Sequence, residues 1–342
     1  MSATRKCIVW DLDNTLWDGV CLEGTVALRH PVIQAIRELD GRGILHSIAS
    51  RGDEDQALSV LEKHDIARYF LVRRINWLPK SQNVIAIAKE LDISLGSIAF
   101  VDDDEFEREQ MAFMLPDVLT VDARGAPALP KMPEFSPGIV TKESQGRRRF
   151  YRSELERRRS EGNYPTREEF LLSCAMRLTV RPMNREDIPR VLELMTRTHQ
   201  LNTTGWVLTR DALAELSESR SGLPKIFVAE LDDKYGPYGI IGTAIVETGP
   251  SLWRLKYLAV SCRVLGRGIE RAFLVSLLRE ARDLGLACAE AMYRDTGRNR
   301  MMRALYQMMA FRQVGVPNEA GAMIFRARLG DIPHIPRWVE VR

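Results

Sequence analysis

The segment Lys6–Thr15, KCIVWDLDNT, decides the fold of the first half of the sequence. Its apolar start has the composition of a buried strand, and two carboxylates, Asp11 and Asp13, follow where that strand would give way to a loop. Open α/β sheets bind their ligands at the carboxyl ends of their strands. Carboxylates spaced in this way can take separate roles, one attacking phosphorus and the other protonating the leaving group and later activating water.

The sequence around this segment alternates strand-like and helix-like stretches, which is the order that a parallel, doubly wound sheet requires. The pattern predicts strands at 6–11, 44–49, 69–72, 97–101 and 118–121 and helices at 32–42, 54–64, 81–91 and 105–115. Only the short stretch 17–31 separates the first strand from the first helix, so no large cap is expected there. We therefore predict an α/β domain over residues 1–125.

Further polar residues follow the other strands predicted for this domain. Asp102 and Asp103 come after an apolar run and would meet Asp11 at the same edge of the sheet. Convergent carboxylate oxygens are the ligands that Mg²⁺ prefers. Ser50 ends another strand and Lys80 opens a helix, and a hydroxyl and an ammonium are the groups needed to hold a phosphoryl group.

The polar residues at these strand ends form four elements in chain order: the pair Asp11 and Asp13, then Ser50, then Lys80, then the pair Asp102 and Asp103. This series resembles the haloacid dehalogenase (HAD) superfamily of phosphohydrolases. The resemblance implies that Asp11 forms an aspartyl-phosphate, that Asp13 is the acid and base, and that Ser50 and Lys80 bind phosphate. It also implies a set of Mg²⁺ ligands, namely Asp11, Asp102, Asp103 and the backbone carbonyl of Asp13. The alternative is that Asp11 and Asp13 only cap a turn and that Ser50 is an ordinary loop hydroxyl.

The second half of the sequence has a different order of elements. A proline-rich stretch and an Arg-rich run of helical composition predict a linker and connecting helix over 126–167, followed by a second domain over 168–330 and a tail over 331–342. The expected strands are 177–181, 226–231, 239–247, 252–260, 287–293 and 322–329, and the expected helices are 186–201, 268–284 and 299–310. We therefore predict an α+β domain containing an antiparallel meander.

One loop of this second domain carries a chemical signal. Arg263, Gly266 and Gly268 follow a predicted strand and open a helix, where glycines let backbone amides close around phosphate oxygens. Cys262 comes one residue before this loop. The helix N-terminus and the neighbouring Arg263 would favour its thiolate, which makes Cys262 a candidate nucleophile. The alternative for any single cysteine, a small buried hydrophobe, is applied to the cysteines at 21, 174 and 288.

The loop and the surrounding strands resemble the pyrophosphate loop of the GNAT acyltransferase fold, in which the loop grips coenzyme A or a pantetheine arm. Asn299 and Tyr306 lie near the positions where GNAT proteins place side chains close to the thiol. In residues 197–204, RTHQLNTT, His199 and Asn202 are candidates for orienting a substrate or stabilising an oxyanion. Polar caps at a helix end are the alternative for these two residues.

The two modules together, with KCIVWDLDNTLWDG, RTHQLNTT and SCRVLGRG, resemble the FkbH-like glyceryltransferase/phosphatase family over nearly the whole chain. The resemblance implies that the chain dephosphorylates 1,3-bisphosphoglycerate and passes the glyceryl group to the phosphopantetheine thiol of an acyl carrier protein in polyketide biosynthesis. It implies a cysteine thioester as the intermediate, with Cys262 as the first choice for the thiol and Cys7 as the reserve. An acyl phosphate is already activated, so a thiolate can displace phosphate without ATP.

The sequence departs from the family pattern around Trp17, His199 and Asp295, which leaves another phosphorylated three-carbon acid open as the substrate. Three rival functions also stay open. The chain could be a phosphatase whose second domain only binds carrier protein, an acetyl-CoA-dependent acetyltransferase with a degenerate first domain, or a non-catalytic adaptor. The intact acidic set argues against the adaptor.

Composition narrows the remaining choices. The chain has 342 residues, 45% hydrophobic and 28% charged, which is typical of a folded protein with more than one domain. A net charge of +3 is too small to indicate a nucleic-acid partner. No signal-peptide core or membrane-spanning stretch is seen, and the cysteines are scattered, so a cytoplasmic protein with reduced thiols is expected. The Arg-rich run 147–159 predicts a solvated helix, with a docking face for an acidic carrier protein as the alternative.

Overall fold

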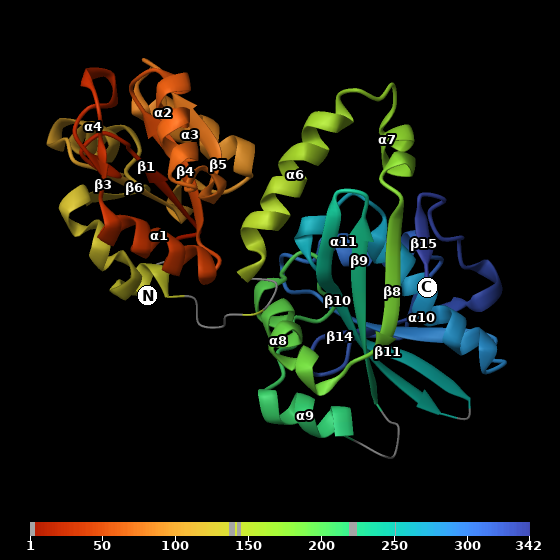
Figure 1. The fold of residues 1–342 in the computed structure, drawn as a ribbon. Helices are drawn as coiled ribbons and strands as arrows, with labels where there is room; N and C mark the ends of the chain where they lie inside the picture. The colour runs from red at the N-terminus through yellow and green to blue at the C-terminus, as the bar shows by residue number, and fades with distance from the viewer. Residues whose placement is uncertain (1–3, 137–140, 142–144, 219–223, 250) are drawn as a thin grey trace. The chain divides into compact units, whose positions relative to one another are not determined.

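The computed structural model describes residues 4–136, 141, 145–218, 224–249 and 251–342. The chain divides into two compact units, Met1–Arg158 and Arg159–Arg342 (Figure 1). Residues 137–140 and 142–144 of the predicted linker lie outside the described residues. The two units are described separately below.

The first unit contains a five-stranded sheet with the strand order β5-β4-β1-β6-β7, and every pair of neighbouring strands is parallel. Its strands are β1 (Cys7–Trp10), β4 (Leu45–Ser50), β5 (Phe70–Ile75), β6 (Ile98–Asp102) and β7 (Leu119–Asp122). The central strand β1 is buried along its whole length, as its apolar sequence predicts. The predicted α/β fold of this half is confirmed.

Helices supply the apolar side chains that pack on this sheet. They are α1 (His30–Gly41), α2 (Glu54–Lys63), α3 (Lys80–Leu91) and α4 (Glu105–Met114), with the short 3-10 helices η2 (Ala67–Tyr69), η3 (Leu95–Ser97), η4 (Ala123–Lys131) and η5 (Pro133–Phe135). Because side chains alternate along a strand, Ile8 of β1 joins one core cluster with Val32 of α1, whereas Val9 joins another with Val84 of α3. The sheet therefore has a core on each face.

Only a small insertion separates β1 from α1. It holds the two-stranded hairpin of β2 (Trp17–Asp18) and β3 (Ala27–Leu28) and the 3-10 helix η1 (Cys21–Glu23). The expectation that this domain lacks a large cap is confirmed.

The Arg-rich run forms helix α6 (Arg147–Glu161), but its first turns are not simply solvated. Leu155 joins the core cluster that contains β1 side chains. The guanidinium of Arg148 makes two bonds to the carboxylate of Asp40, at 2.7 and 3.1 Å, and Arg152 donates to the carbonyl of Arg68 at 2.7 Å. The solvated-helix prediction is therefore wrong for this part of α6, because several arginines bind their own unit.

The second unit contains an eight-stranded mixed sheet with the order β13-β14-β12-β11-β10-β9-β8-β15. Its strands are β8 (Met176–Pro182), β9 (Lys225–Asp233), β10 (Gly236–Gly249), β11 (Leu252–Val260), β12 (Cys288–Arg294), β13 (Arg312–Val314), β14 (Ala322–Arg328) and β15 (Val339–Val341). Strands β9 to β11 form the predicted antiparallel meander, and β8 extends it by pairing antiparallel with β9. The predicted α+β organisation is confirmed.

The helices of this unit are α7 (Arg167–Ser173), α8 (Ile188–Arg197), α9 (Arg210–Glu218), α10 (Ile269–Asp283) and α11 (Arg300–Met308), with 3-10 helices η6 (Arg185–Asp187), η7 (Cys262–Val264) and η8 (Leu329–Asp331). The helix predicted over 186–201 ends early, at Arg197. The residues of the predicted tail belong to the fold, since β15 pairs with β8. Among the described residues, no helix has the length and apolar character needed to cross a membrane.

Candidate functional site

The first unit brings two buried carboxylates onto one ammonium at the carboxyl edge of its sheet. Asp11 follows β1, Asp102 ends β6, and Lys80 opens α3. The Nζ atom of Lys80 lies 2.8 Å from Oδ1 of Asp11 and 2.6 Å from Oδ2 of Asp102. All three side chains are buried. Residues far apart in the sequence therefore form one charged cluster, as the strand-end argument predicts.

The loop after β6 is held in place by the chain's own polar groups. Oδ1 of Asp102 accepts a bond from the backbone amide of Asp104, whose own carboxylate caps α4. The guanidinium of Arg108 donates to the backbone carbonyls of Asp102 and Asp103, at 3.0 and 2.7 Å. These bonds fix the direction in which the Asp102 and Asp103 side chains leave the loop. The role of Arg108 was not predicted from the sequence.

Burial and charge set the protonation of this cluster. Burial raises the pKa of Asp11, an effect that Lys80 and a hydrogen bond from Ser50 partly oppose. Burial, and then the charge of Asp11, raise the pKa of Asp102 to about 7. Burial alone would lower the pKa of Lys80, but the two carboxylates raise it overall. Two buried carboxyl groups therefore share one ammonium, and each holds its proton more tightly than an isolated carboxyl group does.

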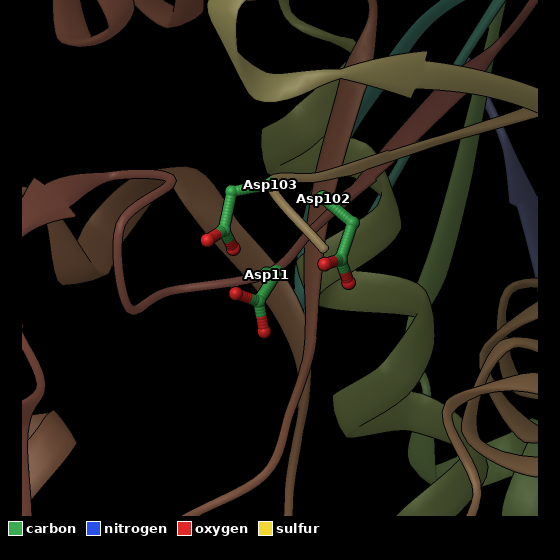
Figure 2. Close-up of side chains that lie close together, drawn as sticks. All are labelled: Asp11, Asp102 and Asp103. Carbon is green, nitrogen blue, oxygen red and sulfur yellow. The ribbon is translucent and has the colours of Figure 1, made fainter. Parts of the chain in front are cut away.

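A divalent cation fits this imbalance. Oxygen atoms of Asp11, Asp102 and Asp103 lie within 4.8 Å of one another, and Figure 2 shows the three carboxylates side by side. Asp11 and Asp102 are buried, whereas Asp103 is exposed, so the group is open to solvent on one side. Oxygen-only, carboxylate-rich sites of this kind suit Mg²⁺. The raised pKa of Asp102 is what an acidic site shows before a cation neutralises it.

Asp13 is oriented by a residue whose role the sequence did not reveal. Its Oδ1 atom accepts bonds from the indole Nε1 of Trp17, at 2.7 Å, and from the backbone amide of Cys21, at 2.9 Å. Asn14, directly after Asp13, has a φ of 51°, which turns the chain sharply after the second aspartate. Trp17 lies in the quoted motif, yet only the hairpin geometry shows that its ring reaches Asp13.

Ser50 ends β4 beside this group, and a pocket there is lined by Asp13, Ser50, Arg51 and Cys21, among others. The Ser50 hydroxyl is almost fully buried and contacts Asp11. Arg51 forms an ion pair of 2.8 Å with the buried carboxylate of Glu107. The sequence predicted Ser50 at this edge but gave no reason to single out Arg51.

The second unit contains a different pocket, around Cys262. This cysteine is exposed at the start of η7, directly after β11. It shares a surface pocket of about 380 Å³ with Arg197, His199, Gln200 and Arg298. The structure therefore brings together Cys262 and His199, two residues that the sequence singled out separately. Arg197 lies in RTHQLNTT and Arg298 directly precedes Asn299, but the place of these two arginines beside the thiol was not predicted.

The reserve candidate, Cys7, is unsuited to nucleophilic chemistry. It is fully buried in β1 within a core cluster. Burial raises the pKa of its thiol to about 12, so the thiolate is disfavoured at neutral pH. The reserve role of Cys7 is therefore wrong. The buried setting expected for Cys288 is also wrong, because that residue is exposed, whereas Cys174 is buried as expected.

Residues 201–204 fill a gap in the sheet of the second unit. Strands β11 and β12 pair only at Arg254–Glu290 and Leu255–Ala291. Beyond those pairs, the backbone of Thr203 donates to the carbonyl of Leu258 on β11 and accepts from the amide of Arg294 on β12, at 3.0 and 2.9 Å. The inserted segment thus satisfies backbone groups that diverging strands would leave unpaired.

Three predicted substrate-orienting residues hold this inserted segment in place. Asn202, Asn299 and Tyr306 are almost completely buried. Asn299 donates to the carbonyls of Asn202, Thr203 and Arg294, and Asn202 accepts from the amides of Thr204 and Gly205. The hydroxyl of Tyr306 donates to the carbonyl of Met292 at 3.1 Å. Polar atoms of these three side chains already bind groups of the protein itself, and their role in orienting a substrate stays a prediction.

The glycine loop is also occupied by the chain itself. Gly266 and Gly268 have φ values of 76° and 73°, which only glycine adopts easily. A Cβ atom on Gly266 would lie 2.9 Å from the guanidinium of Arg167, and one on Gly268 would lie 3.0 Å from Pro336. Close packing against these two residues accounts for both glycines without a phosphate ligand.

The start of α10 carries negative charge of its own. Glu270 lies in the first turn, its Oε2 atom has no hydrogen-bond partner in the described part of the chain, and burial raises the pKa of its carboxyl group. A carboxylate there competes with a phosphate for the helix N-terminus. The backbone amide of Arg263 donates to the Ser261 hydroxyl at 3.4 Å. The grip on phosphate by Arg263, Gly266 and Gly268 stays a prediction.

Comparison with known proteins gives only partial likenesses. No family model and no curated protein matches the chain. One similar solved structure is the N-terminal part of protein BF1531 from Bacteroides fragilis, which contains a phosphatase domain complexed with Mg. The match has 26% sequence identity and a TM-score of 0.33, and it covers 36% of this chain and 38% of that one.

Two acetyltransferase structures are also similar to part of the chain. The ribosomal-protein-S18-alanine N-acetyltransferase from Escherichia coli is 19% identical, with a TM-score of 0.35, over 44% of this chain and 94% of its own. The IAA acetyltransferase from Bacillus cereus is 18% identical, with a TM-score of 0.32, over 44% of this chain and 99% of its own.

Proposed function

We propose that this protein is a two-site enzyme that removes phosphate from a phosphorylated three-carbon acid and transfers the acyl group to the thiol of a carrier protein. The convergence of Asp11, Lys80, Asp102 and Asp103 at one sheet edge carries the proposal. The resemblance to FkbH-like proteins suggests 1,3-bisphosphoglycerate as the donor and the phosphopantetheine arm of an acyl carrier protein as the acceptor.

The geometry of the first site supports phosphate hydrolysis through the two aspartates. Lys80 binds Oδ1 of Asp11 at 2.8 Å, whereas Oδ2 accepts a long bond of 3.5 Å from the Thr15 hydroxyl, so we assign the attack on phosphorus to Oδ2. The bond from phosphorus to Asp11 forms as the bond to the substrate oxygen breaks, and water then cleaves the phosphoenzyme. Within the described residues both bonds to Asp13 reach Oδ1, which leaves Oδ2 to protonate the leaving oxygen and then to deprotonate water.

The remaining groups of the first site hold charge and position. Asp11, Asp102, Asp103 and the backbone carbonyl of Asp13 would hold Mg²⁺, which when bound supplies charge neutralisation for the phosphoryl group. Lys80 keeps Asp11 from repelling Asp102 and presents an ammonium to the incoming phosphate. Ser50, at the end of β4, is placed to donate to a phosphate oxygen.

The second site supports thiol chemistry. Cys262 is exposed in a pocket with His199, a residue able to accept the thiol proton. Attack of the sulfur on an acyl phosphate forms a thioester and releases phosphate, and attack by a carrier-protein thiol then regenerates Cys262. The gap between β11 and β12 is filled by the chain's own backbone, so an acyl carrier's arm has to reach the thiol over the surface pocket.

The experiment for the first site measures glycerate-containing products and phosphate released from enzymatically generated 1,3-bisphosphoglycerate in the presence of Mg²⁺. Asp11→Asn should lower removal of the phosphomonoester by at least about 1,000-fold, because the nucleophile is lost. Asp117→Asn is the matched control, since it makes the same change at an exposed position of the same unit, and it should leave the rate unchanged. Equal rates for wild type and Asp11→Asn would exclude the proposed nucleophile.

The rival functions give different results in the same assay series. Phosphate release without any covalent adduct on the protein would favour a phosphatase whose second unit only binds carrier protein. Turnover of acetyl-CoA that survives Asp11→Asn would favour an acetyltransferase. Loss of carrier-protein acylation in Cys262→Ala, with phosphatase activity retained, is the result that our proposal expects.

A further inference from the structure

One stretch of the second unit carries cations without acids. Residues 296–318 contain four arginines and no Asp or Glu, although the whole chain has a net charge of only +3. The stretch includes α11 and β13. Within the described residues its arginines form no ion pair, and all of them are exposed, namely Arg298, Arg300, Arg303 and Arg312. Their positive charge therefore faces solvent.

The Arg-rich helix α6 differs in this respect. Arg148 bonds to the carboxylate of Asp40 at 2.7 Å, and Arg157 is buried against Glu154 at 2.5 Å. These guanidiniums are neutralised by carboxylates of their own unit. The charge best suited to an acidic partner therefore lies on α11 and β13 rather than on these arginines of α6.

The sheet of the second unit leaves Arg312 without an acid. Strand β13 is the outermost strand on one side of this sheet, and Arg312 lies opposite Arg326 of β14. The carboxylate of Glu290 on β12 already binds both Arg326 and Arg254 of β11, each at 2.6 Å. Like charges opposite each other destabilise a strand pair. A carboxylate supplied from outside, beside Arg312, would relieve this repulsion and continue the alternation of charge across the sheet.

Exposed apolar side chains lie among these cations. Met301 and Met308 of α11 are 43% and 67% exposed, and Val314 of β13 is 39% exposed. A groove of about 540 Å³ is lined by Met308 together with Arg303 and Arg312. Arginine and methionine are enriched at protein interfaces. We call this surface the α11 face, and it consists of Arg300, Met301, Arg303 and Met308 of α11 with Arg312 and Val314 of β13.

The α11 face begins beside the pocket of the exposed cysteine. Arg298 lines that pocket with Cys262, and α11 starts two residues later, at Arg300. From Arg300 to Met308 the helix rises about 12 Å, at 1.5 Å per residue. A protein bound on the α11 face would therefore lie next to the opening through which a thiol-bearing arm has to reach Cys262.

From these observations we propose that the α11 face is the docking surface for the carrier protein that accepts the acyl group. The partner that fits presents carboxylates to Arg303 and Arg312 around an apolar patch that covers Met308. The identity of this partner rests on the proposed function. A second copy of this chain fits poorly, because a two-fold contact through the same surface would set arginines against arginines.

The first test measures binding of fluorescently labelled holo acyl carrier protein to the full chain without any acyl donor. Arg303→Glu and Arg312→Glu should each raise Kd by about 10-fold or more, because attraction to a carboxylate becomes repulsion, and added salt should weaken binding to wild type. Arg279→Glu is the matched control, since it reverses the charge of an exposed arginine on another helix, α10. Its Kd should equal that of wild type.

Two outcomes of the binding experiment would overturn the proposal. One is an equal Kd for wild type, Arg303→Glu and Arg312→Glu, and the other is no binding by wild type at all. Sedimentation of the chain alone tests the remaining occupant. A wild-type dimer that Arg303→Glu dissociates would assign the α11 face to a second copy of the chain and would also overturn the proposal.

A second test separates this proposal from the proposed function. The chain is first acylated with enzymatically generated 1,3-bisphosphoglycerate and Mg²⁺, and transfer to holo acyl carrier protein is then followed per acylated Cys262. At low carrier concentration Arg312→Glu should slow transfer by about 10-fold, and a saturating concentration should restore the rate. An unchanged rate would contradict docking on the α11 face. If no chain formed an adduct while the binding losses were found, the proposed function would be wrong and the docking surface would stand.

Discussion

Replacement of Asp102 by Asn should change how the stability of the first unit depends on pH. Asp102 has its pKa raised from 3.8 to about 7, mainly by burial. A shift of about three units corresponds to about 4 kcal/mol at 1.36 kcal/mol per unit. A raised pKa in the folded state means that the protonated form is favoured by folding. The stabilisation is present below about pH 4 and is lost as the pH rises through about 7.

The difference between wild type and Asp102→Asn, rather than wild type alone, is the quantity to measure. His46 is buried, and burial lowers its pKa to about 3, so its contribution to stability rises with pH in part of the same range. In the wild-type profile of unfolding free energy against pH, the opposite contributions of Asp102 and His46 would partly cancel. The variant removes the Asp102 carboxyl group, and the contribution of His46 cancels in the difference.

The assay measures the free energy of unfolding by urea, in EDTA, at several pH values between about 4 and 8. The transition to follow is the one that added Mg²⁺ shifts, because the acidic site lies in the first unit. We expect wild type to lose up to about 4 kcal/mol relative to Asp102→Asn as the pH rises across this range. Added Mg²⁺ at pH 8 should stabilise wild type more than the variant, because a ligand that binds only the folded state raises its stability. A difference that stays constant with pH, or grows in favour of wild type in EDTA, would refute the reasoning.

Three further substitutions test other contacts. Lys80→Met should destabilise the metal-free protein by about 3–5 kcal/mol in urea titrations, because it leaves buried carboxylates without a cation. Trp17→Phe should lower kcat for phosphate release about 10-fold or more with little change in KM, as measured by steady-state kinetics. The substitution removes the indole hydrogen bond that orients Asp13 but keeps an aromatic ring at this position. Asn299→Ala should lower stability by about 2–3 kcal/mol in thermal or urea unfolding, because buried carbonyls lose their donor.

The cluster of the first unit was predictable because parallel strands share one carboxyl edge. Asp11, Asp102 and Lys80 are far apart in the sequence, but each lies at a strand end or helix start whose place in a parallel sheet follows from the alternation of elements. What could not be predicted is which side chains fix the acids. Trp17 reaches Asp13 only because a short hairpin folds back beside β1, and local patterns do not encode that approach.

The second unit shows where sequence periodicity fails. The apolar repeat predicts a helix through Leu201, but the chain leaves the helix at Thr198 and runs extended between β11 and β12. The unpaired backbone groups of the two diverging strands provide the reason, and they become visible only when the sheet is assembled. Asn202 and Asn299, which were singled out as substrate-orienting candidates, both hydrogen-bond within this segment.

The polar residues of the connecting helix illustrate a second limit. Composition alone cannot tell whether an arginine faces water or a neighbouring carboxylate. Arg148 bonds to Asp40, which lies 108 positions away in the sequence, and no local pattern pairs the two. The exposed setting of Cys262 was consistent with its loop, but the guanidiniums around it come from two other segments.

Intact-protein mass spectrometry tests the central claim most directly. Wild type, Cys262→Ala and Cys288→Ala are incubated with Mg²⁺ and enzymatically generated 1,3-bisphosphoglycerate, and holo acyl carrier protein is then added; Cys288 is the control because it too is exposed. Our account predicts a covalent acyl adduct on wild type and Cys288→Ala, none on Cys262→Ala, and transfer of the adduct to the carrier protein. An adduct that persists in Cys262→Ala, or phosphate release with no adduct on wild type, would contradict it.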